Sequence, residues 1–401
     1  MNREAQHSFK KTPMLLAMMI IATGQVGVAI YLPALPMISQ DLQVDQASVQ
    51  MLVTLFLLGF GGSQLFYGAL SDAVGRRPTF ILGQGIYLLG TILCVTFSDH
   101  FSSLEMGRLL QGLGAGSASV LGRSVLRDSY DGAHLTKAMS YIAITASIMP
   151  IVAPVVGGWM TYHLSWQSVF TFVMIYISAI FTLGYFILPE TLPYAKKRFE
   201  ATKVVGNYWA LLRNWQVLSS ASYNWISYLS SLVTLSVLPF LLQKQLGMTA
   251  AEYGSIMIIP SAGLLTGSVL VNIFHRYFSS RQLLGAAIGI MIFAGVWLLL
   301  MPFNVFNLIW AFTWLTVAQG MSFPISTTML LAPHKTQAGS VSALSGSIQM
   351  VIAGVLGGFL VEHCVTSQGA LGWFYLATSS SMLLVLILSA AQRDVSTQPS
   401  T

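Results

Sequence analysis

Long apolar runs separated by short polar segments make up most of the chain. Each run has about 20 residues, which is the length that an α-helix needs to cross the hydrocarbon core of a bilayer. The runs cover residues 14–32, 49–70, 79–97, 104–121, 138–162, 166–188, 215–242, 252–274, 282–301, 304–331, 338–361 and 370–391. The pattern therefore predicts an all-α membrane protein with twelve transmembrane helices.

One polar connector, residues 189–214, is much longer than the others and divides the runs into two groups of six. We expect an N-terminal six-helix bundle over residues 1–188, a cytoplasmic linker, and a C-terminal six-helix bundle over residues 215–401. An internal repeat favours this division. Residues 140–163 align with residues 340–363 at a constant offset of 200 and share nine identities, among them a Gly-Gly pair and a terminal histidine. Repeated halves that meet at the bilayer midplane are a common plan of transporters.

Composition and charge agree with this pattern. The chain is 55% hydrophobic and 8% charged, whereas a soluble domain has about 25% charged residues. With both termini inside, seventeen of the nineteen Lys and Arg fall on inner segments; only Lys244 lies on an outer loop and Arg108 within a helix. Basic residues in short loops are retained on the cytoplasmic side. The net charge of +6 thus reflects topology rather than nucleic-acid binding, and we expect a multi-pass membrane protein with both termini in the cytoplasm.

Several classes of protein find no support in the sequence. Cys94 and Cys364 lie in or beside apolar segments, so we expect neither a disulfide framework nor a metal cluster. The phosphate-binding pattern G-x-x-x-x-G-K-[ST] of ATP-driven pumps does not occur. A membrane-embedded enzyme, the competing class, would need a nucleophile and a base that converge, and no motif indicates them. We therefore expect no enzyme and no cofactor.

The segment from Gly68 to Pro78 is the most charged and turn-rich connection between two apolar runs. One interpretation is an ordinary hairpin with basic residues on the cytoplasmic side. The spacing is more specific, because it resembles the G-x-L-x-D-x-x-G-R-R/K loop between the second and third helices of major facilitator superfamily transporters. The matching residues are Gly68, Leu70, Asp72, Gly75, Arg76 and Arg77.

This resemblance implies a major facilitator fold in which the loop belongs to an inner gate. Gly68 would let two helices approach closely, and Gly75 can turn with a positive φ. Asp72 can face a helix N-terminus or an arginine. We predict that its partners are Arg123 or Arg127, which we place in the next inner loop, and that these contacts form in the outward-open state and break in the inward-open state.

Two further motifs resemble those of drug:proton antiporters. In the predicted fourth helix, Arg108, Gln111, Gly112 and Gly114 are similar to R-x-x-Q-G-x-G. A charge facing lipid is costly, so Arg108 should face the bundle interior or water. The alternative is that it extends to the outer interface. In the fifth helix, Pro150, Pro154, Gly157 and Gly158 resemble the G-P-x-x-G-G signature of exporters, with Ala153 where glycine is usual; plain tight packing is the alternative.

With Pro33 and Pro36 near the end of the first helix, the whole chain resembles exporters of the Bcr/CflA and multidrug resistance protein D type. The resemblance implies a monomeric multidrug efflux transporter that exports amphipathic, often cationic molecules by alternating access in exchange for protons. Its partners would be small-molecule drugs, protons and membrane lipid. An exporter or facilitator of a specific metabolite is the alternative.

Substrate contacts are expected on the helices that this fold makes central, the first, fourth, seventh and tenth. Their polar and aromatic residues offer stacking, hydrogen bonds and attraction of cations. The candidates are Gln25, Tyr31, Arg108, Gln111, Tyr223, Asn224, Trp225, Tyr228, Trp314 and Gln319, together with Gln349 on the eleventh helix. Aromatic residues near helix ends can instead anchor the protein at the membrane interface.

Proton coupling lacks the expected acid. Drug:proton antiporters often carry a carboxylate deep in the first or seventh helix, yet residues 14–32 and 215–242 contain none. The nearest candidate is Glu105, which lies three residues before Arg108 and thus on the same helical face. We predict that Glu105 and Arg108 couple export to protons; a simple ion pair at the outer interface is the alternative.

Overall fold

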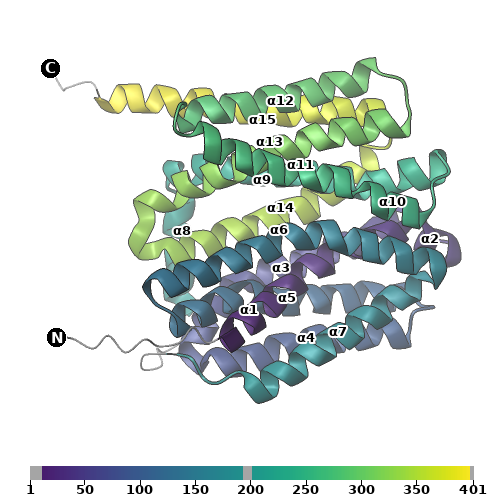
Figure 1. Ribbon diagram of the computed structural model, residues 1–401, viewed down its shortest axis with the longest axis horizontal. Helices are drawn as coiled ribbons and strands as arrows, with labels where there is room; N and C mark the ends of the chain where they lie inside the picture. Colours follow the sequence, from purple (N-terminus) through teal and green to yellow (C-terminus); the bar gives the residue numbers. More distant parts are fainter. Residues whose placement is uncertain (1–10, 193–200, 398–401) are drawn as a thin grey trace.

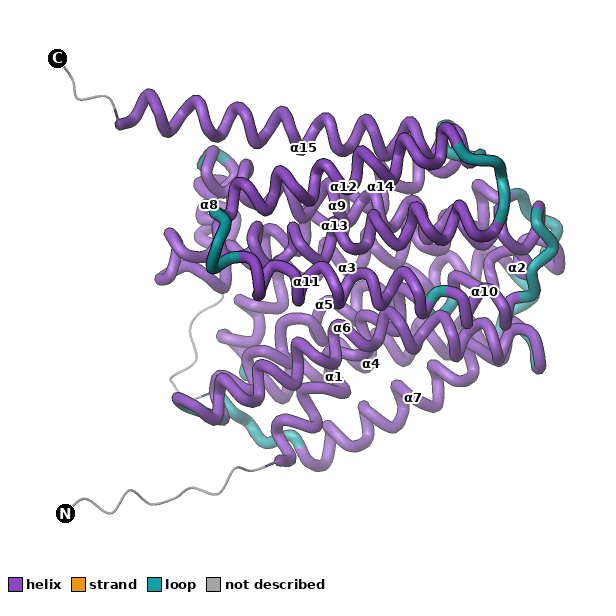
Figure 2. The backbone as a smooth tube through the Cα atoms, turned by 45° about the horizontal axis from the view of Figure 1, so that its top comes forward, coloured by secondary structure: helices purple, strands orange, loops and turns teal. Residues whose placement is uncertain are grey.

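The computed structural model describes residues 11–192 and 201–397, and within them every regular element is a helix (Figures 1 and 2). The N-terminal half contains α1 (Lys11–Ala29), η1 (Leu32–Ala34), α2 (Leu35–Asp41), α3 (Gln46–Val74), α4 (Arg76–Thr96), α5 (Phe101–Ser129), α6 (Gly132–His163) and α7 (Trp166–Ile187). After α8 (Ala201–Leu212), the C-terminal half contains α9 (Trp215–Pro239), η2 (Phe240–Gln245), α10 (Ala250–Ile256), α11 (Ile258–Phe274), α12 (Ser280–Leu300), α13 (Val305–Leu331), η3 (Ala332–Gln337), α14 (Ala338–His363) and α15 (Gln368–Thr397).

The predicted number of membrane spans is confirmed. Eleven segments of the described chain are long and apolar enough to cross a membrane; α1, η1 and α2 together form the first, and α10 and α11 together form another. The twelfth span is α5, which has 29 residues. Its hydropathy is lower because it carries charged residues such as Glu105, Arg108 and Arg123.

Several boundaries differ from the predicted ones. The first helix breaks after Ala29, near Pro33 and Pro36, but helical structure continues to Asp41, beyond the predicted end of the first apolar run at residue 32. Proline explains the break, because it fixes φ and lacks the backbone donor. The fourth span continues to Ser129, so Arg123 and Arg127 lie on a helix and not in the predicted loop.

The linker contains a helix that the polar composition did not predict. Helix α8 is amphipathic: Leu211 is buried against the C-terminal half, whereas Val205 and Trp209 are exposed. The Tyr208 hydroxyl donates to the Leu65 carbonyl of α3 at 3.0 Å, and burial raises the pKa of Tyr208. The linker residues Lys196, Lys197 and Arg198 lie outside the described residues.

The two halves meet along α3 and α14. A Cβ on Gly354 of α14 would lie 3.1 Å from the Leu57 Cβ of α3, so the two backbones approach closely. Small residues permit such contacts between membrane helices. Helix α1 begins and α15 ends at the same end of the molecule (Figure 1, left). We call this the inner end and the opposite one the outer end, following the predicted orientation.

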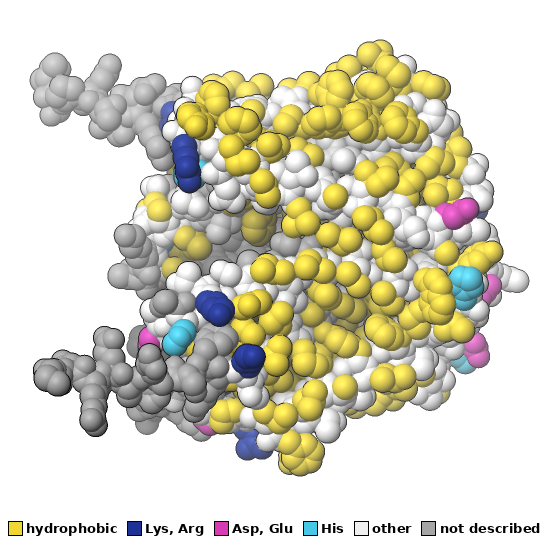
Figure 3. All heavy atoms as spheres, in the orientation of Figure 1, with side chains coloured by type: hydrophobic (Ala, Val, Ile, Leu, Met, Phe, Trp, Pro, Cys, Tyr) yellow, Lys and Arg dark blue, Asp and Glu magenta, His cyan; other side chains and the backbone are white. Residues whose placement is uncertain are grey.

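The surface fits a protein surrounded by lipid. Hydrophobic side chains cover the middle of the face shown in Figure 3, with Lys and Arg mainly near the left edge and Asp and Glu near both edges. Large apolar residues such as Phe186, Phe306 and Trp373 are exposed on the surface of the protein. Lys and Arg thus gather toward the inner end on this face, as the predicted orientation requires.

Candidate functional site

Arg108 of α5 is the most deeply buried charge of the membrane interior, with 1% of its surface exposed. Its guanidinium donates to the Leu52 carbonyl of α3 at 3.2 Å, the Gly27 carbonyl of α1 at 3.0 Å and Gln111 Oε1 at 2.9 Å. Gln111 Nε2 in turn donates to Thr91 Oγ1 of α4 at 2.9 Å. One arginine therefore links α1, α3 and α5 directly, and α4 through Gln111.

Aromatic rings complete the surroundings of this arginine. The guanidinium carbon lies 4.4 Å from the ring centre of Tyr31 and 4.3 Å from that of Phe56. Cations are attracted to such ring faces, more strongly when water is excluded. Gly27 lies near the C-terminal end of α1, where helix carbonyls carry partial negative charge. Neutral groups thus stabilise the charge.

The predicted pair of Glu105 and Arg108 does not form among the described contacts. Arg108 is fully buried, and its described hydrogen bonds go to carbonyl and amide oxygens; Glu105 is half-exposed. Residues three apart share a helix face, but the arginine side chain reaches α1 and α3. The alternative that Arg108 extends to the outer interface is wrong, because its side chain is inside the N-terminal half.

On the C-terminal side, α9 places Tyr228 toward the N-terminal half. Tyr228 packs against the hydrophobic cluster that includes Tyr31 and Phe56. Trp225 faces α14 instead, where its indole nitrogen donates to the Ser345 carbonyl at 3.0 Å. Tyr228 therefore lies between the halves, whereas Trp225 joins two helices of the C-terminal half.

The three glutamine candidates other than Gln111 are half-buried. Gln319 of α13 lies one turn from Ser322, which contacts α9, and one turn from Thr316, which contacts α11. Gln319 therefore lies on the side of α13 that faces between α9 and α11. Gln349 of α14 follows Ser345 by four residues and so shares its α9 side, and Gln25 lies on α1 two residues before Gly27.

Two predicted substrate residues lie away from the interface between the halves. Tyr223 is fully buried within the C-terminal half, in the cluster formed with α12, α13 and α15. Trp314 packs on Phe293 of α12 and on Trp310, at ring separations of 5.9 and 5.6 Å, and both of these rings are partly exposed at the perimeter. The sequence placed both residues on the correct helices but could not give the rotation of each helix.

The inner loop turns at Gly75, whose φ is 115°, as its glycine predicted. Arg76 of α4 is buried and donates to Asp72 at 2.6 Å and to Asp128 of α5 at 2.8 Å. Among the described contacts, Asp72 thus pairs with Arg76 rather than with the predicted Arg123 or Arg127. Those two arginines are exposed on α5.

Glu190 is part of this loop and was missed in the sequence. Its carboxylate accepts from the Arg76 backbone N–H at 2.8 Å and so caps the N-terminus of α4, where negative charge is favourable. Arg77 donates to the Tyr185 carbonyl of α7 at 2.9 Å. Gly68 lies in α3 with open space beside it, so it does not make the close helix contact that we predicted.

The fifth-span motif closes the outer end. Pro150 and Pro154 lie inside α6, and Gly157 contacts the Ile30 carbonyl. A Cβ on Gly158 would contact the Ala250 carbonyl of α10 and lie 3.1 Å from the Cα of Gly254. The backbones of the two halves therefore touch here.

Two hydrogen bonds strengthen this closure. Gln243 donates to the Pro33 carbonyl at 3.1 Å, and Gln50 of α3 donates to Ser236 of α9 at 3.1 Å. We call these contacts, with the Gly158–Gly254 packing, the outer closure. At the opposite end, Figure 3 shows the molecule hollowed at its left edge between the halves.

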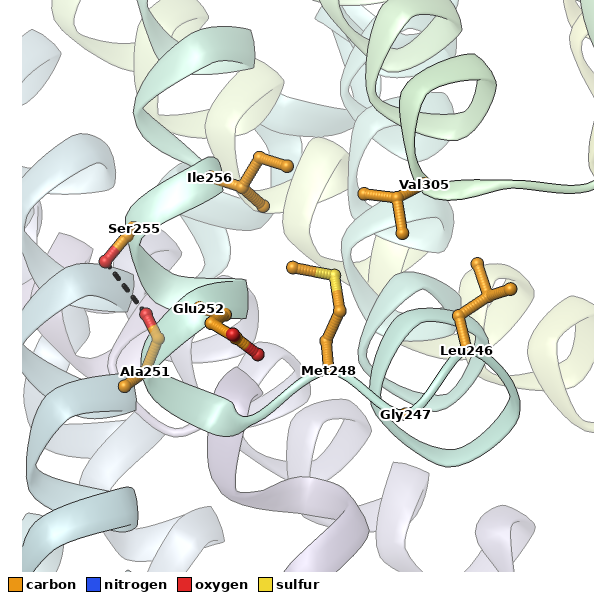
Figure 4. Close-up of a pocket in the computed structure, with 8 residues that line it drawn as sticks. All are labelled: Leu246, Gly247, Met248, Ala251, Glu252, Ser255, Ile256 and Val305. Carbon is orange, nitrogen blue, oxygen red and sulfur yellow. Dashed lines mark hydrogen bonds between the residues drawn. The ribbon is translucent and has the colours of Figure 1, made fainter.

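A separate open pocket of about 740 Å³ lies at the outer end of the C-terminal half (Figure 4). Its lining includes Met248, Ile256, Val305 and Glu252, whose carboxylate accepts from the Thr249 backbone N–H in a capping box. The pocket contains none of the predicted substrate residues.

Twelve membrane spans in two halves, closed against each other at one end, define a membrane transporter. The sequence matches the model of the Major Facilitator Superfamily over residues 15–358, and the chain belongs to this family. The predicted family and fold are thereby confirmed.

Among its relatives are two named multidrug resistance proteins. Multidrug resistance protein D of Escherichia coli is 28% identical over 389 residues, which cover 93% of this chain and 94% of the relative. Multidrug resistance protein MdtL of Shigella dysenteriae serotype 1 is 28% identical over 374 residues, which cover 92% and 93%.

Solved structures of two transporters show the same fold. A mutant of the nucleoside transporter NupG superposes with a TM-score of 0.72 at 12% identity, covering 95% of this chain and 99% of that one. A bacterial homologue of the human lysosomal transporter Spinster, in an inward-facing and unoccupied conformation, gives a TM-score of 0.67 at 14% identity, with 96% of each chain covered.

Proposed function

We propose that the protein exports amphipathic, often cationic small molecules across the bacterial inner membrane by alternating access, in exchange for protons. The names of the relatives support drugs as substrates. The observation that supports the proposal is Tyr228 of α9, which packs against the hydrophobic cluster of the N-terminal half. Asn224 lies one turn before Tyr228 and contacts α13, the helix that carries Gln319. Rings and neutral polar groups of this kind suit varied amphipathic ligands.

In this cycle, the bundles of residues 1–188 and 215–401 move as units about the linker 189–214. The described conformation, with its outer closure formed, corresponds to the stage that takes up substrate from the cytoplasm. The contacts of Asp72, Arg76 and Asp128 hold α3, α4 and α5 together at the inner end. Because these contacts join helices of one half and are formed while the outer closure is also formed, we propose that they support the N-terminal side of the inner gate rather than break during the cycle. We also propose that the transporter is a monomer.

In the Glu105→Gln variant, we expect ethidium uptake into inside-out vesicles to be no faster with a proton gradient, acid inside, than with the gradient collapsed. Wild-type protein should show gradient-driven uptake, because a titrating carboxylate exchanges the proton. Drug binding should be the same in both proteins, since Glu105 makes no described contact with Arg108 or Tyr228. Fluorescence of trapped ethidium measures the rate.

Exposed Asp99, changed to Asn, provides a matched control that should keep gradient-driven uptake. Gradient-dependent uptake at the wild-type rate in Glu105→Gln would remove Glu105 from the coupling mechanism. Gradient-independent uptake by the wild type would contradict proton exchange itself. Uptake restricted to one metabolite from a broad panel would favour the alternative, an exporter or facilitator of a defined compound.

We expect an impermeant maleimide to label Cys364 in intact cells, because this thiol is exposed after α14 at the predicted outer end. Cys94 is buried and should stay unlabelled. A cysteine introduced at exposed Trp209 of the linker, in a Cys364→Ser background, should react only after the cells are permeabilised. The opposite pattern would reverse the proposed orientation.

A further inference from the structure

We propose that Asn224 of α9 is the hydrogen-bond acceptor by which this transporter recognises cations that carry N–H groups; the inference rests on the proposed function. The side chain is buried, with 6% of its surface exposed. Its Nδ2 donates to Thr327 Oγ1 of α13 at 3.3 Å. Its Oδ1 has no partner among the described residues.

The neighbours of α9 show which side of this helix carries the Asn224 amide. Ser227 meets Ser322 of α13, and Trp225 meets Ser345 of α14. Asn224 precedes Tyr228 by four residues, so both lie on the same face. Because Tyr228 packs against the N-terminal half, this face is directed toward the interface between the halves.

A buried amide oxygen without a donor is unfavourable, and native proteins pair nearly all such groups. In this arrangement the nearest hydroxyl, Thr327 Oγ1, accepts from Nδ2, while Ser230 donates to the Ile226 carbonyl and Ser322 to Ser227 or the Gln319 carbonyl. A ligand N–H that reached Asn224 Oδ1 would supply its missing hydrogen bond. Hydrogen bonds from charged donors are the stronger ones.

The charge of such a ligand would be stabilised without an ion pair. Helix α9 contains no Asp, Glu, Lys or Arg from Trp215 to Pro239. The Tyr228 ring lies on the same face as Asn224 and can attract a cation. The ligand class is therefore an apolar body with a positive charge and at least one N–H donor.

Two probes separate the hydrogen bond from the charge. Ethidium carries aromatic amino groups with N–H donors, whereas tetraphenylphosphonium is a cation of similar apolar character without any. We expect Asn224→Leu to weaken ethidium binding by about tenfold, the loss of one hydrogen bond to a charged ligand. Tetraphenylphosphonium binding should stay within about twofold of the wild type by the same reasoning. Equilibrium binding to purified protein in detergent measures both.

Asn224→Asp keeps the acceptor oxygens and adds negative charge, so ethidium should bind at least as tightly as to the wild type. Asn272→Leu is the matched control, because Asn272 is an exposed amide on α11 that bonds its own helix. It should change neither affinity. Thermal unfolding of each variant shows that the fold is retained.

Three results would overturn the assignment. Equal losses for both probes in Asn224→Leu would show that Asn224 supports the shape of the site. Unchanged ethidium binding would show that the ligand does not use Oδ1, and weaker ethidium binding in Asn224→Asp would show that the amide acts as a donor. If wild-type protein bound neither probe, the proposed function would fail as well, which distinguishes the two failures.

Discussion

Arg108→Ala should abolish export and lower the thermal stability of the protein. The change removes three hydrogen bonds and takes the arginine donor away from Gln111 Oε1 and from the Gly27 carbonyl near the end of α1, both in the interior. Each unpaired buried group costs about 1–3 kcal/mol. For two such groups, the α1–α3–α5 junction would lose about 2–6 kcal/mol, which is a large effect for one substitution.

Arg108→Lys separates charge from geometry. Lysine keeps the cation between the rings of Tyr31 and Phe56, but a single ammonium does not match the planar set of N–H groups that reaches two helices and Gln111. We expect partial stability and strongly reduced export. Export is measured in vesicles and unfolding by heating in detergent. Wild-type values of both in Arg108→Ala would show that the buried arginine has no organising role.

Asp72→Asn should slow transport by about tenfold, which corresponds to 1.4 kcal/mol, and leave substrate affinity within about twofold. The carboxylate lies 2.6 Å from Arg76, but about a third of its side chain is exposed, so solvent reduces the strength of the pair. Asp128 would retain Arg76 in the variant, since its side chain is nearly buried. The gate should be weakened rather than destroyed.

Rapid-mixing measurements of ethidium export, compared with equilibrium binding, test this expectation. Asp99→Asn removes the same charge from an exposed position at the outer end and should change neither rate nor affinity. Loss of binding together with normal cycling of the bound protein would show that Asp72 belongs to the substrate site and not to the gate.

Sequence and structure agree best where backbone chemistry sets the result. The apolar runs predicted all twelve spans because each must be long enough to cross the bilayer and satisfy its own hydrogen bonds. Gly75 predicted a turn with positive φ, and the structure confirms it. Pro33 and Pro36 likewise mark the break in the first span.

Contacts between distant segments could not be predicted in this way. The partners of Arg108 include the carbonyls of Gly27 and Leu52, and because every residue has a carbonyl, the sequence carries no signal for them. Spacing along one helix suggested Glu105 instead. Trp314 was expected in the substrate site, but it packs on Phe293 and Trp310. An apolar run identifies a helix but does not determine which side of that helix faces the centre of the protein.

The described contacts of the outer closure involve no charged group. Glycine backbones meet at Gly158 and Gly254, and Gln243 and Gln50 donate to neutral oxygens. The inner loop, by contrast, is held by Arg76 between two carboxylates. Salt screens exposed charges but has little effect on neutral packing. In the proposed orientation, the end that faces the changing medium outside the cell is therefore insulated from its ionic strength and acidity, while the ionic end faces the buffered cytoplasm.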